Sequence, residues 1–514
     1  MLKGAASYAD VIARLGRADA GLTFGARADV ALSYAELAEL VRGNAEHFRA
    51  LGVRRGDRVA LSLETDPEHV VALLALVAMG AVPVSVKPRR GAVDEYAATL
   101  GRLCGRFGVR YAYHTLPALE GTTAIGWSET ARSKGSSALA EAGPDDLAVV
   151  QFSSGSLGAP KAIPIRHGAL LANLGAILEV DGRTPGSLVY NFLPLSHDMG
   201  LIGGLFSNLV LENPLRLTKP QAFLRDPLGV FLQGACEIVP MPNFALRYLA
   251  RAVEARAAKA GLPADLFARV RSVFCGAEPI RLEAVSSLAS AGADYGFDPR
   301  AIVFCYGLAE ATLIVTARRF GTLEDSFCAK GDARVVASVG APVAGTEVRV
   351  GARDASGRPV PAGPGVEGAV FIKGPGVFRG YLDDEPVVHE GWFDTGDLGF
   401  ERDGELYISG RAKDLIIVNG ENIFPDDVEG VASRQPGVRE CLVLADDDRF
   451  YLYLIPEPGA ALDPEGVASA IGSSFGAVPA RVIAGPQGSI LRTSSGKPMR
   501  QAMLARLREA EALR

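Results

Sequence analysis

The sequence predicts an α/β fold, with a large N-terminal domain followed by a small α+β domain. Helical and strand patterns alternate over roughly the first 310 residues, which indicates largely parallel sheet. After about residue 340 the chain becomes turn-rich, as expected for a β-rich subdomain. The region from Arg411 onward carries strands and helices of its own, enough for a small domain.

The alternation begins near the N-terminus. Apolar residues at helical spacing predict a helix between Leu32 and Leu51, with Gly52 as its C-cap. We expect a strand at 58–63, a buried helix at 68–79 and a buried strand at 81–86. Each strand is therefore joined to the next by a helix, which is the connection that parallel strands need.

The same pattern returns further along the chain. We expect strands at 147–152, 188–193, 271–275 and 301–305, with a helix at 169–178. Each of these strands runs directly into a loop of small or polar residues. Because ligands of open α/β sheets bind beyond the carboxyl ends of strands, four such loops predict one substantial site.

The remaining elements are shorter. The turn-rich stretch is 348–363, with antiparallel strands expected at 369–372 and 405–408. The last region carries expected strands at 415–418, 441–444 and 450–455, and helices at 426–434 and 464–475.

Composition narrows the function classes. The chain has 514 residues, which favours two or more domains, and its formal net charge of −6 argues against a nucleic-acid partner held by bulk electrostatics. The longest apolar run, Val70 to Val86, is broken by Gly80 and Pro83, so we expect no membrane span. Met1 to Arg14 lacks the pattern of a signal peptide.

The spacing of the cysteines gives no sign of a metal or redox site. The six cysteines are scattered, and no pair has the C-x-x-C spacing of a metal or redox site. We expect reduced, mostly buried thiols and a cytoplasmic protein.

A loop of small residues after the strand at 147–152 is the first chemical signal. It reads Ser153-Ser154-Gly155-Ser156-Leu157-Gly158-Ala159-Pro160-Lys161. Small residues let backbone N–H groups approach an anion closely, and lysine adds a compact positive charge, which suits a polyphosphate. The loop is not a Walker A motif, because the Gly-Lys-Ser/Thr ending is absent; the alternative is a surface loop.

Three further segments follow strands and are candidates for the same site. They read Asn191-Phe192-Leu193-Pro194-Leu195-Ser196-His197-Asp198-Met199-Gly200, Gly276-Ala277-Glu278-Pro279 and Tyr306-Gly307-Leu308-Ala309-Glu310-Ala311-Thr312. His197 precedes what reads as a Gly-rich turn. Tyr306 has a ring to cover a flat base, and Glu310 has the oxygen ligands that Mg²⁺ prefers. Each segment alone is compatible with an ordinary strand end.

Two more segments lie nearer the C-terminus. The first runs from Gly391 to Asp397 and continues at Gly410-Arg411-Ala412-Lys413-Asp414; the second is Thr493-Ser494-Ser495-Gly496-Lys497. A carboxylate at Asp397 suits two ribose hydroxyls, and Arg411 carries a planar donor fork for phosphate or ribose. A charged turn between domains and a solvated basic loop are the plainer interpretations.

Taken together, the six segments resemble the adenylate-forming superfamily of acyl- and aryl-CoA synthetases, peptide-synthetase adenylation domains and firefly-type luciferases. The resemblance spans roughly Thr23 to Met503. Within this superfamily, the sequence motifs resemble those of fatty acyl-AMP ligases most in the stretches beginning at His197, Pro242, Gly276, Tyr306 and Gly410. The resemblance implies an enzyme that uses ATP and Mg²⁺ to convert a carboxylic acid to acyl-AMP with release of pyrophosphate.

The resemblance also implies roles for individual residues. The nucleotide would be held by Ser153, Ser154, Gly155, Ser156, Gly158, Lys161, Gly276, Ala277, Glu278, Pro279, Tyr306, Gly307, Asp397 and Arg411. Lys497, Arg411, Glu310 and His197 would be the catalytic residues, with Glu310 also holding Mg²⁺. The acid would contact His197, Met199, Leu201, Asn243, Phe244 and Leu308, a largely apolar set that favours a hydrophobic acid.

The hinge of the superfamily falls on Lys413 in this chain. The resemblance therefore implies a large ATP- and acyl-binding domain at 1–412 and a mobile C-terminal domain at 413–514. A lysine on a mobile domain would serve adenylation in one state and be withdrawn in the next.

The chain departs from the superfamily pattern at several positions. Leu157 stands where Thr is usual in the phosphate loop, and Ala162-Ile163 replaces Gly-Val. Ala309 replaces the usual Thr before the glutamate, although fatty acyl-AMP ligases share that Ala. Those ligases also resemble one another in an insertion after the Glu310 motif, and the segment from Thr312 to Gly340 is too short for all of it.

The sequence is therefore compatible with three functions. The first is an acyl-AMP ligase that loads the phosphopantetheine thiol of an acyl or peptidyl carrier protein. The second transfers the acyl group to free CoA. The third, from another class, is a homologue that binds nucleotide or a partner protein without adenylating.

Overall fold

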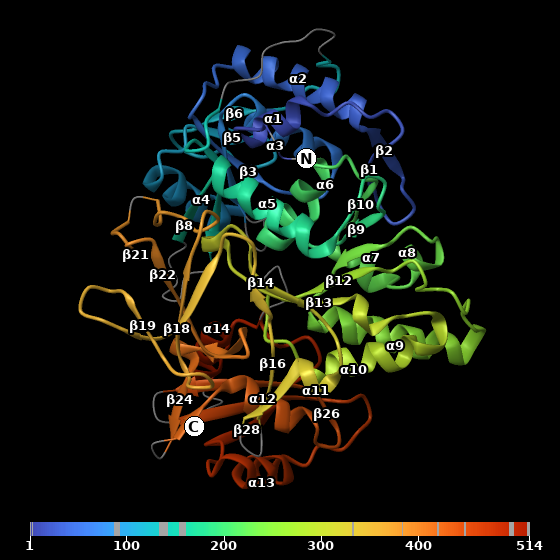
Figure 1. Ribbon diagram of the computed structural model, residues 1–514, viewed down its shortest axis with the longest axis vertical. Coiled ribbons are helices and arrows are strands. Elements are labelled where there is room, and N and C mark those ends of the chain that lie inside the picture. Colours follow the sequence, from blue (N-terminus) through green and yellow to red (C-terminus); the bar gives the residue numbers. More distant parts are fainter. Residues whose placement is uncertain are drawn as a thin grey trace.

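The computed structural model of the protein describes residues 2, 4–86, 93–132, 142–153, 161–330, 334–382, 384–418, 421–446, 449–492 and 498–510. Two parallel-rich sheets form the N-terminal part, a β-rich part follows, and the C-terminal residues form the lower end of the molecule in Figure 1. The α/β class predicted from the alternating pattern is confirmed.

The first parallel-rich sheet has six strands in the order β6-β5-β3-β4-β7-β8. Its strands β3 (Arg58–Ser62), β4 (Val82–Val86) and β7 (Leu147–Ser153) are parallel, and β8 (Lys161–Arg166) runs antiparallel to β7. The helix α3 (Pro67–Ala78) connects β3 to β4. Every residue from Val70 to Ala78 is at most 1% exposed, so the longest apolar run is a buried helix and strand, as predicted.

The second sheet has nine strands in the order β17-β14-β13-β12-β11-β9-β10-β1-β2. Its centre is parallel and consists of β9 (Val189–Asn191), β11 (Ile238–Pro240), β12 (Ser272–Cys275) and β13 (Ile302–Gly307). The carboxyl ends of these four strands therefore lie along one edge. β14 (Ile314–Arg319) returns antiparallel to β13.

Helices cover these sheets. The helix α2 (Tyr34–Ala50) begins with a capping box between Ser33 and Glu36. The helix α5 (His167–Asp181) ends at Gly182, whose positive φ of 61° suits glycine. One helix departs from expectation, because the Gly-rich stretch after His197 is the π-helix η1 (Met199–Phe206) rather than a turn.

The glycines of η1 have a packing role instead of a turn role. A Cβ on Gly204 would lie 2.2 Å from Nδ2 of Asn191, and one on Gly200 would lie 2.3 Å from the Pro194 carbonyl oxygen. Side chains at these positions would clash with neighbouring structure, so glycine lets the helix lie directly against the strand β9 and its loop.

The β-rich part is an antiparallel sheet of β18 (Glu347–Arg353), β19 (Pro359–Pro361), β20 (Gly368–Lys373), β21 (Val388–His389), β22 (Trp392–Arg402) and β23 (Glu405–Arg411). It confirms the turn-rich, β-rich region predicted after residue 340. A two-stranded sheet of β15 (Phe327–Lys330) and β16 (Arg334–Ala337) packs against it through Cys328, Val336, Phe400 and Tyr407.

The C-terminal region carries two hydrophobic clusters built only from residues 416 and later. Its elements are β24 (Ile416–Val418), β25 (Glu421–Ile423), α12 (Pro425–Ser433), β26 (Val438–Asp446), β27 (Arg449–Pro456), α13 (Pro464–Phe475), β28 (Arg481–Ala484) and α14 (Arg500–Glu509). Arg281 of the N-terminal part pairs across to Asp426 at 3.2 Å and to Glu429 at 3.3 Å.

All six cysteines are free thiols. Cys104, Cys236 and Cys275 are buried, and the other three are partly exposed. Among the described residues, no helix combines the length and the apolar character that crossing a bilayer requires.

Candidate active site

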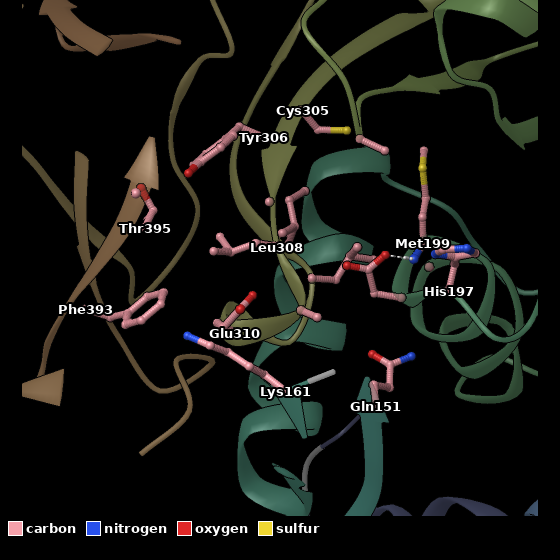
Figure 2. Close-up of a pocket in the computed structure, with 18 of the residues that line it drawn as sticks. Gln151, Lys161, His197, Met199, Cys305, Tyr306, Leu308, Glu310, Phe393 and Thr395 are labelled. Atoms are coloured by element: carbon pink, nitrogen blue, oxygen red, sulfur yellow. Dashed lines mark hydrogen bonds between the residues drawn. The ribbon is translucent and has the colours of Figure 1, made fainter. Parts of the chain in front are cut away.

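A cavity of about 740 Å³ opens where the carboxyl ends of the parallel strands of the second sheet meet β7, β8 and the β-rich part. Tyr306, Gly307 and Leu308 line it from the end of β13, and Ala277 lines it from the loop after β12. Thr395, Gly396 and Arg411 line it from β22 and β23. Described residues of five of the six segments that the sequence singled out thus line one cavity, and Figure 2 shows several of their side chains around it; Thr493 to Lys497 lies outside the described residues.

Lys161 and Glu310 meet at Tyr381. The ammonium of Lys161 lies 4.4 Å from the centre of the Tyr381 ring, and the Tyr381 hydroxyl donates to Oε1 of Glu310 at 2.8 Å. Both charged side chains extend into the cavity in Figure 2. Burial raises the pKa of Glu310, and the hydrogen bond from Tyr381 opposes that shift. A cation and a carboxylate therefore lie together beside the cavity.

The loop that carries Glu310 is held rigidly. Asn173 of α5 donates to the carbonyl oxygens of Ala311 and Ile314, and its own oxygen accepts from the Ile314 N–H at 3.1 Å. Thr312 has a positive φ of 69°, which is costly for a β-branched residue. Its hydroxyl donates to the Gly376 carbonyl at 2.8 Å, one of the contacts that hold this conformation.

Asp397 lies behind the cavity wall and is held by two wall residues. The Tyr306 hydroxyl donates to its Oδ2 at 2.6 Å, and Nε of Arg411 lies 2.9 Å from its Oδ1. Asp397 is 4% exposed. Because Asp397 is close, the pKa of the Arg411 guanidinium rises above its usual value.

The loop after β12 approaches β13 very closely. A Cβ on Gly276 would lie 2.6 Å from the carbonyl oxygen of Cys305, so this position has no room for a side chain. Ala277 follows with a positive φ of 68° and lines the cavity. Asn243 supports the loop by donating to the Pro279 carbonyl and by accepting from the Arg281 N–H.

The residues expected to contact the acid divide into two groups. His197, Met199 and Leu308 line the cavity. Leu201 is fully buried in the core, and Asn243 and Phe244 are outside the described cavity lining, with Phe244 38% exposed. Helical periodicity in η1 turns Met199 toward the cavity and Leu201 into the core, whereas Asn243, the first residue of α9 (Asn243–Ala260), is engaged in hydrogen bonds to Pro279 and Arg281.

Several residues expected to hold the nucleotide do not line the described cavity or lie outside the described residues. Glu278 is partly buried and its Oε1 accepts from the Phe244 N–H at 3.4 Å. Ser154, Gly155, Ser156, Gly158 and Lys497 lie outside the described residues, as does the side chain of Ser153. Lys413 lines the cavity rim within the short 3₁₀ helix η5 (Ala412–Asp414).

The polar cavity residues that the sequence analysis did not single out include Gln151, Arg183 and Tyr381. Both side-chain polar atoms of Gln151 and the hydroxyl of Ser196 are buried without a hydrogen-bond partner among the described residues. Gln151 extends toward the cavity in Figure 2. Unpaired buried polar groups are costly, so they indicate positions where a ligand completes the hydrogen bonding.

The sequence matches a known family over most of this site. The model of the family described as "AMP-binding enzyme" matches residues 16–382, well over half of the chain. A putative acyl-CoA synthetase of Caulobacter vibrioides is 32% identical over 513 residues, covering 91% of this chain and 88% of the relative. The chain belongs to the AMP-binding enzyme family. The resemblance to adenylate-forming ligases is thereby confirmed.

Two further similarities point toward acyl activation. The long-chain-fatty-acid--AMP ligase FadD26 of Mycobacterium tuberculosis is 32% identical over 412 residues, covering 70% of each chain. A solved structure from a study of fatty acyl-adenylate ligases of E. coli and L. pneumophila superposes with a TM-score of 0.86 at 26% identity, covering 99% of both chains. The AMP-binding family enzyme described here thus shares its whole architecture with that ligase.

Glu310 is the cavity carboxylate that the sequence assigns to a metal ion. Among the described residues, no group of three or more His, Cys, Asp and Glu side chains is placed to hold a metal. Mg²⁺ commonly uses one or two carboxylates and takes its remaining ligands from water and substrate phosphates. Glu310 therefore fits a Mg²⁺ ion that arrives with ATP, whereas a resident metal centre would need more ligands.

Proposed function

We propose that this enzyme uses ATP to convert a hydrophobic carboxylic acid to acyl-AMP and then passes the acyl group to the phosphopantetheine thiol of a carrier protein. The observation that carries the proposal is the single cavity that joins Lys161, Glu310, Tyr306 and Arg411 to an apolar extension. That extension is lined by Ile177, Val189, Met199, Ile238, Phe274, Leu308, Leu313 and Ile314. A polyanion and an apolar acid fit in it side by side.

The charges in this cavity suit the attack of a carboxylate on the α-phosphate. The reaction brings two anions together, and negative charge grows on the phosphoryl oxygens and on the departing pyrophosphate. Cations fixed in place beforehand stabilise that charge without reorganising. Lys161 and Arg411 are assigned to phosphate and ribose, Asp397 to the ribose hydroxyls, and Lys497 to the carboxylate and α-phosphate during adenylation. Mg²⁺ on Glu310 would neutralise phosphate charge.

The proposed domain division at 412/413 agrees with the separate packing of the C-terminal residues, whose two hydrophobic clusters contain nothing before residue 416. Lys413 is the proposed hinge. Two ion pairs join Arg281 to α12, and their side chains are 29% exposed for Arg281, 31% for Asp426 and 7% for Glu429, so a rotation of the C-terminal residues would have to separate partly buried charges.

Acyl transfer to free CoA is the second candidate. It is supported by the similarity to the Caulobacter acyl-CoA synthetase. A further observation is the segment from Thr312 to Gly340, where the described residues form only β14, the short helix α11 (Leu323–Ser326) and the small β15–β16 sheet. The insertion expected in fatty acyl-AMP ligases would need more residues between Thr312 and Gly340 than this chain has.

The test combines both half-reactions. The purified protein is incubated with ATP, Mg²⁺ and single acids from fatty, aryl and polycyclic series, and acyl-AMP is measured by mass spectrometry. CoA or a phosphopantetheinylated carrier protein is then added. We expect acyl-AMP from a hydrophobic acid and transfer to the carrier thiol. Transfer to CoA alone selects the second candidate, and absence of acyl-AMP from a folded protein that binds ATP would contradict adenylation itself.

A further inference from the structure

A buried arginine lines the far end of the acyl part of the cavity. Val189 and Ile238, the first residues of β9 and β11, line the cavity together with Arg183, whereas Pro240 lines it from the last residue of β11. Because β9 and β11 are parallel, the cavity runs from the carboxyl ends of the strands back to their amino ends. Arg183 is therefore remote from the reacting carboxylate.

The Arg183 side chain is 1% exposed and is fixed by three partners. Its Nε donates to Oδ2 of Asp181, and its Nη1 donates to Oγ of Ser207 at 3.0 Å and to Oδ1 of Asn208 at 2.8 Å. Asp181 also contacts Nη2. Nη2 has a second N–H for which no partner is present among the described residues.

The partners are themselves held in place. The Ser207 hydroxyl donates to the Gly203 carbonyl at 2.6 Å, and the Asn208 amide donates to the Gly204 carbonyl. Met199, Gly203 and Ser207 follow one another at intervals of four residues, so one helical face leads from the cavity mouth to Arg183. On α5, Ile177 and Asp181 have the same spacing. The polar group at the far end is thus part of a prepared, rigid wall.

The chemistry of this wall differs from that of the rest of the acyl cavity. An alkyl tail that ended against Arg183 would leave the remaining N–H of Nη2 without a partner, which costs free energy in a buried place. A hydrogen-bond acceptor on the tail would satisfy it. Since Asp181 already neutralises Arg183, a second carboxylate on the tail would add an uncompensated charge, so a neutral acceptor is favoured.

We propose that Arg183 is a specificity-determining residue that selects an acid whose distal end carries a neutral hydrogen-bond acceptor, such as a hydroxyl or keto oxygen. The inference rests on the proposed adenylation of a hydrophobic acid. Ser207 follows Met199 by eight positions, which span roughly 12 Å at the α-helical rise and less in the π-helix η1, so the acid has a tail of medium length between its carboxylate and the polar end.

The experiment compares matched acids in the full-length protein. For each of several tail lengths, kcat/KM for acyl-AMP formation is measured with a straight-chain acid and with the acid of the same length that ends in a hydroxyl or carries a keto group near its end. At the best length we expect wild type to prefer the polar-ended acid by roughly 10-fold or more, as expected when a buried donor gains or loses its partner.

A double variant removes the polar end without leaving a buried charge. Arg183→Met alone would strand the Asp181 carboxylate, so it is combined with Asp181→Asn. We expect the double variant to lose or reverse the preference for the polar-ended acid while it still activates the straight-chain acid. Ser207→Ala, which removes one partner of the guanidinium, should weaken the preference. Arg318→Met with Glu405→Gln is the matched control, because that ion pair at 2.5 Å does not line the described cavity.

The ratio of kcat/KM for the polar-ended acid to kcat/KM for the straight-chain acid, taken within each protein, separates an effect on specificity from an effect on stability. A change that only destabilised the fold would lower both rates and leave their ratio unchanged. If wild type prefers the straight-chain acid at every length, or if the double variant keeps the wild-type ratio, the inference about Arg183 is wrong while adenylation stands. If wild type forms acyl-AMP from no acid, the proposed function fails and this inference fails with it.

Discussion

The Tyr306 hydroxyl donates a hydrogen bond of 2.6 Å to Asp397, a residue 91 positions later in the chain. The bond joins the end of β13 in the nine-stranded sheet to β22 of the β-rich part. Arg411 holds the other carboxylate oxygen at 2.9 Å. The assigned base-covering and ribose-binding residues are thereby kept in one fixed arrangement.

We expect Asp397→Asn to raise the KM for ATP roughly 10-fold or more, because it removes the charge that Arg411 pairs with and weakens the ribose acceptor. Tyr306→Phe is the matched variant. It keeps the ring and the carboxylate and loses one hydrogen bond, so its effect should be smaller. Acid-dependent pyrophosphate release at varied ATP concentration measures the KM for ATP in both variants. Equal KM values in wild type and Asp397→Asn would remove Asp397 from the nucleotide site.

Glu310→Gln should raise the Mg²⁺ concentration needed for half-maximal adenylation roughly 10-fold or more, since a neutral amide is a weaker ligand for a hard cation. The pH dependence adds a second readout. Burial raises the pKa of Glu310, so protons compete with Mg²⁺ at higher pH than they would at an exposed carboxyl group. The Mg²⁺ requirement of wild type should therefore rise as pH falls.

Titrating Mg²⁺ at several pH values in wild type and Glu310→Gln checks this prediction. The variant should lose the pH dependence along with the affinity. Glu324→Gln, an exposed position on α11, is the control and should behave as wild type. A wild-type Mg²⁺ requirement that stays constant with pH would argue that Glu310 does not hold the ion.

The assigned roles of the two C-terminal lysines can be separated by half-reaction. Lys497→Ala should lower the rate of acyl-AMP formation roughly 10²-fold or more, comparable to the loss of an important electrostatic donor. Transfer to thiol from pre-formed acyl-AMP should persist. Single-turnover measurements of each half-reaction check the difference. A similar loss in both steps, with the fold intact, would be incompatible with the role assigned to Lys497.

Lys413→Pro should have the opposite pattern. Proline restricts the backbone at the assigned hinge, so adenylation in the starting arrangement should proceed while thiol transfer slows. The same two single-turnover assays apply. Equal retention of both rates would place the hinge elsewhere.

Local sequence signals were enough to predict most elements and the convergence of their loops. The helix α13 was predicted with the bounds it has, because Asp463 caps it, Pro464 occupies its first turn and Gly476 ends it in a left-handed conformation. The strands before Gly276 and Tyr306 were equally visible, since short apolar runs led directly into small residues. These features depend on neighbours along the chain.

The rest depended on contacts between distant parts of the chain. Tyr381 reaches Glu310 across 71 positions, and Asn173 supports the same loop from 138 to 141 positions away. The sequence predicts a turn where the π-helix lies, because the glycines of the helix serve close packing, which has no local signature. Arg183 follows the end of a helix, where an arginine is ordinarily solvated; only the folded chain buries it beside the cavity.

His167 should make the fold sensitive to acid. The side chain is 1% exposed, and its Nδ1 accepts a hydrogen bond from the Tyr8 N–H at 3.1 Å, which requires the neutral ring. Burial lowers the pKa of His167 to about 4, although the charges of Asp146 and Asp10 oppose that shift. In the unfolded chain its pKa is about 6.5, so below that pH the unfolded state takes up a proton that the folded state does not.

The stabilising effect of the neutral ring is therefore complete above about pH 6.5 and is lost as pH falls toward 4, with about 2 kcal/mol gone by pH 5. His167→Gln keeps an acceptor for the Tyr8 N–H and does not titrate. We expect it to be less stable than wild type near neutral pH but to lose less stability on acidification. Thermal unfolding of both proteins between pH 7.5 and 5 measures this difference, and parallel losses would show that the proton is taken up elsewhere.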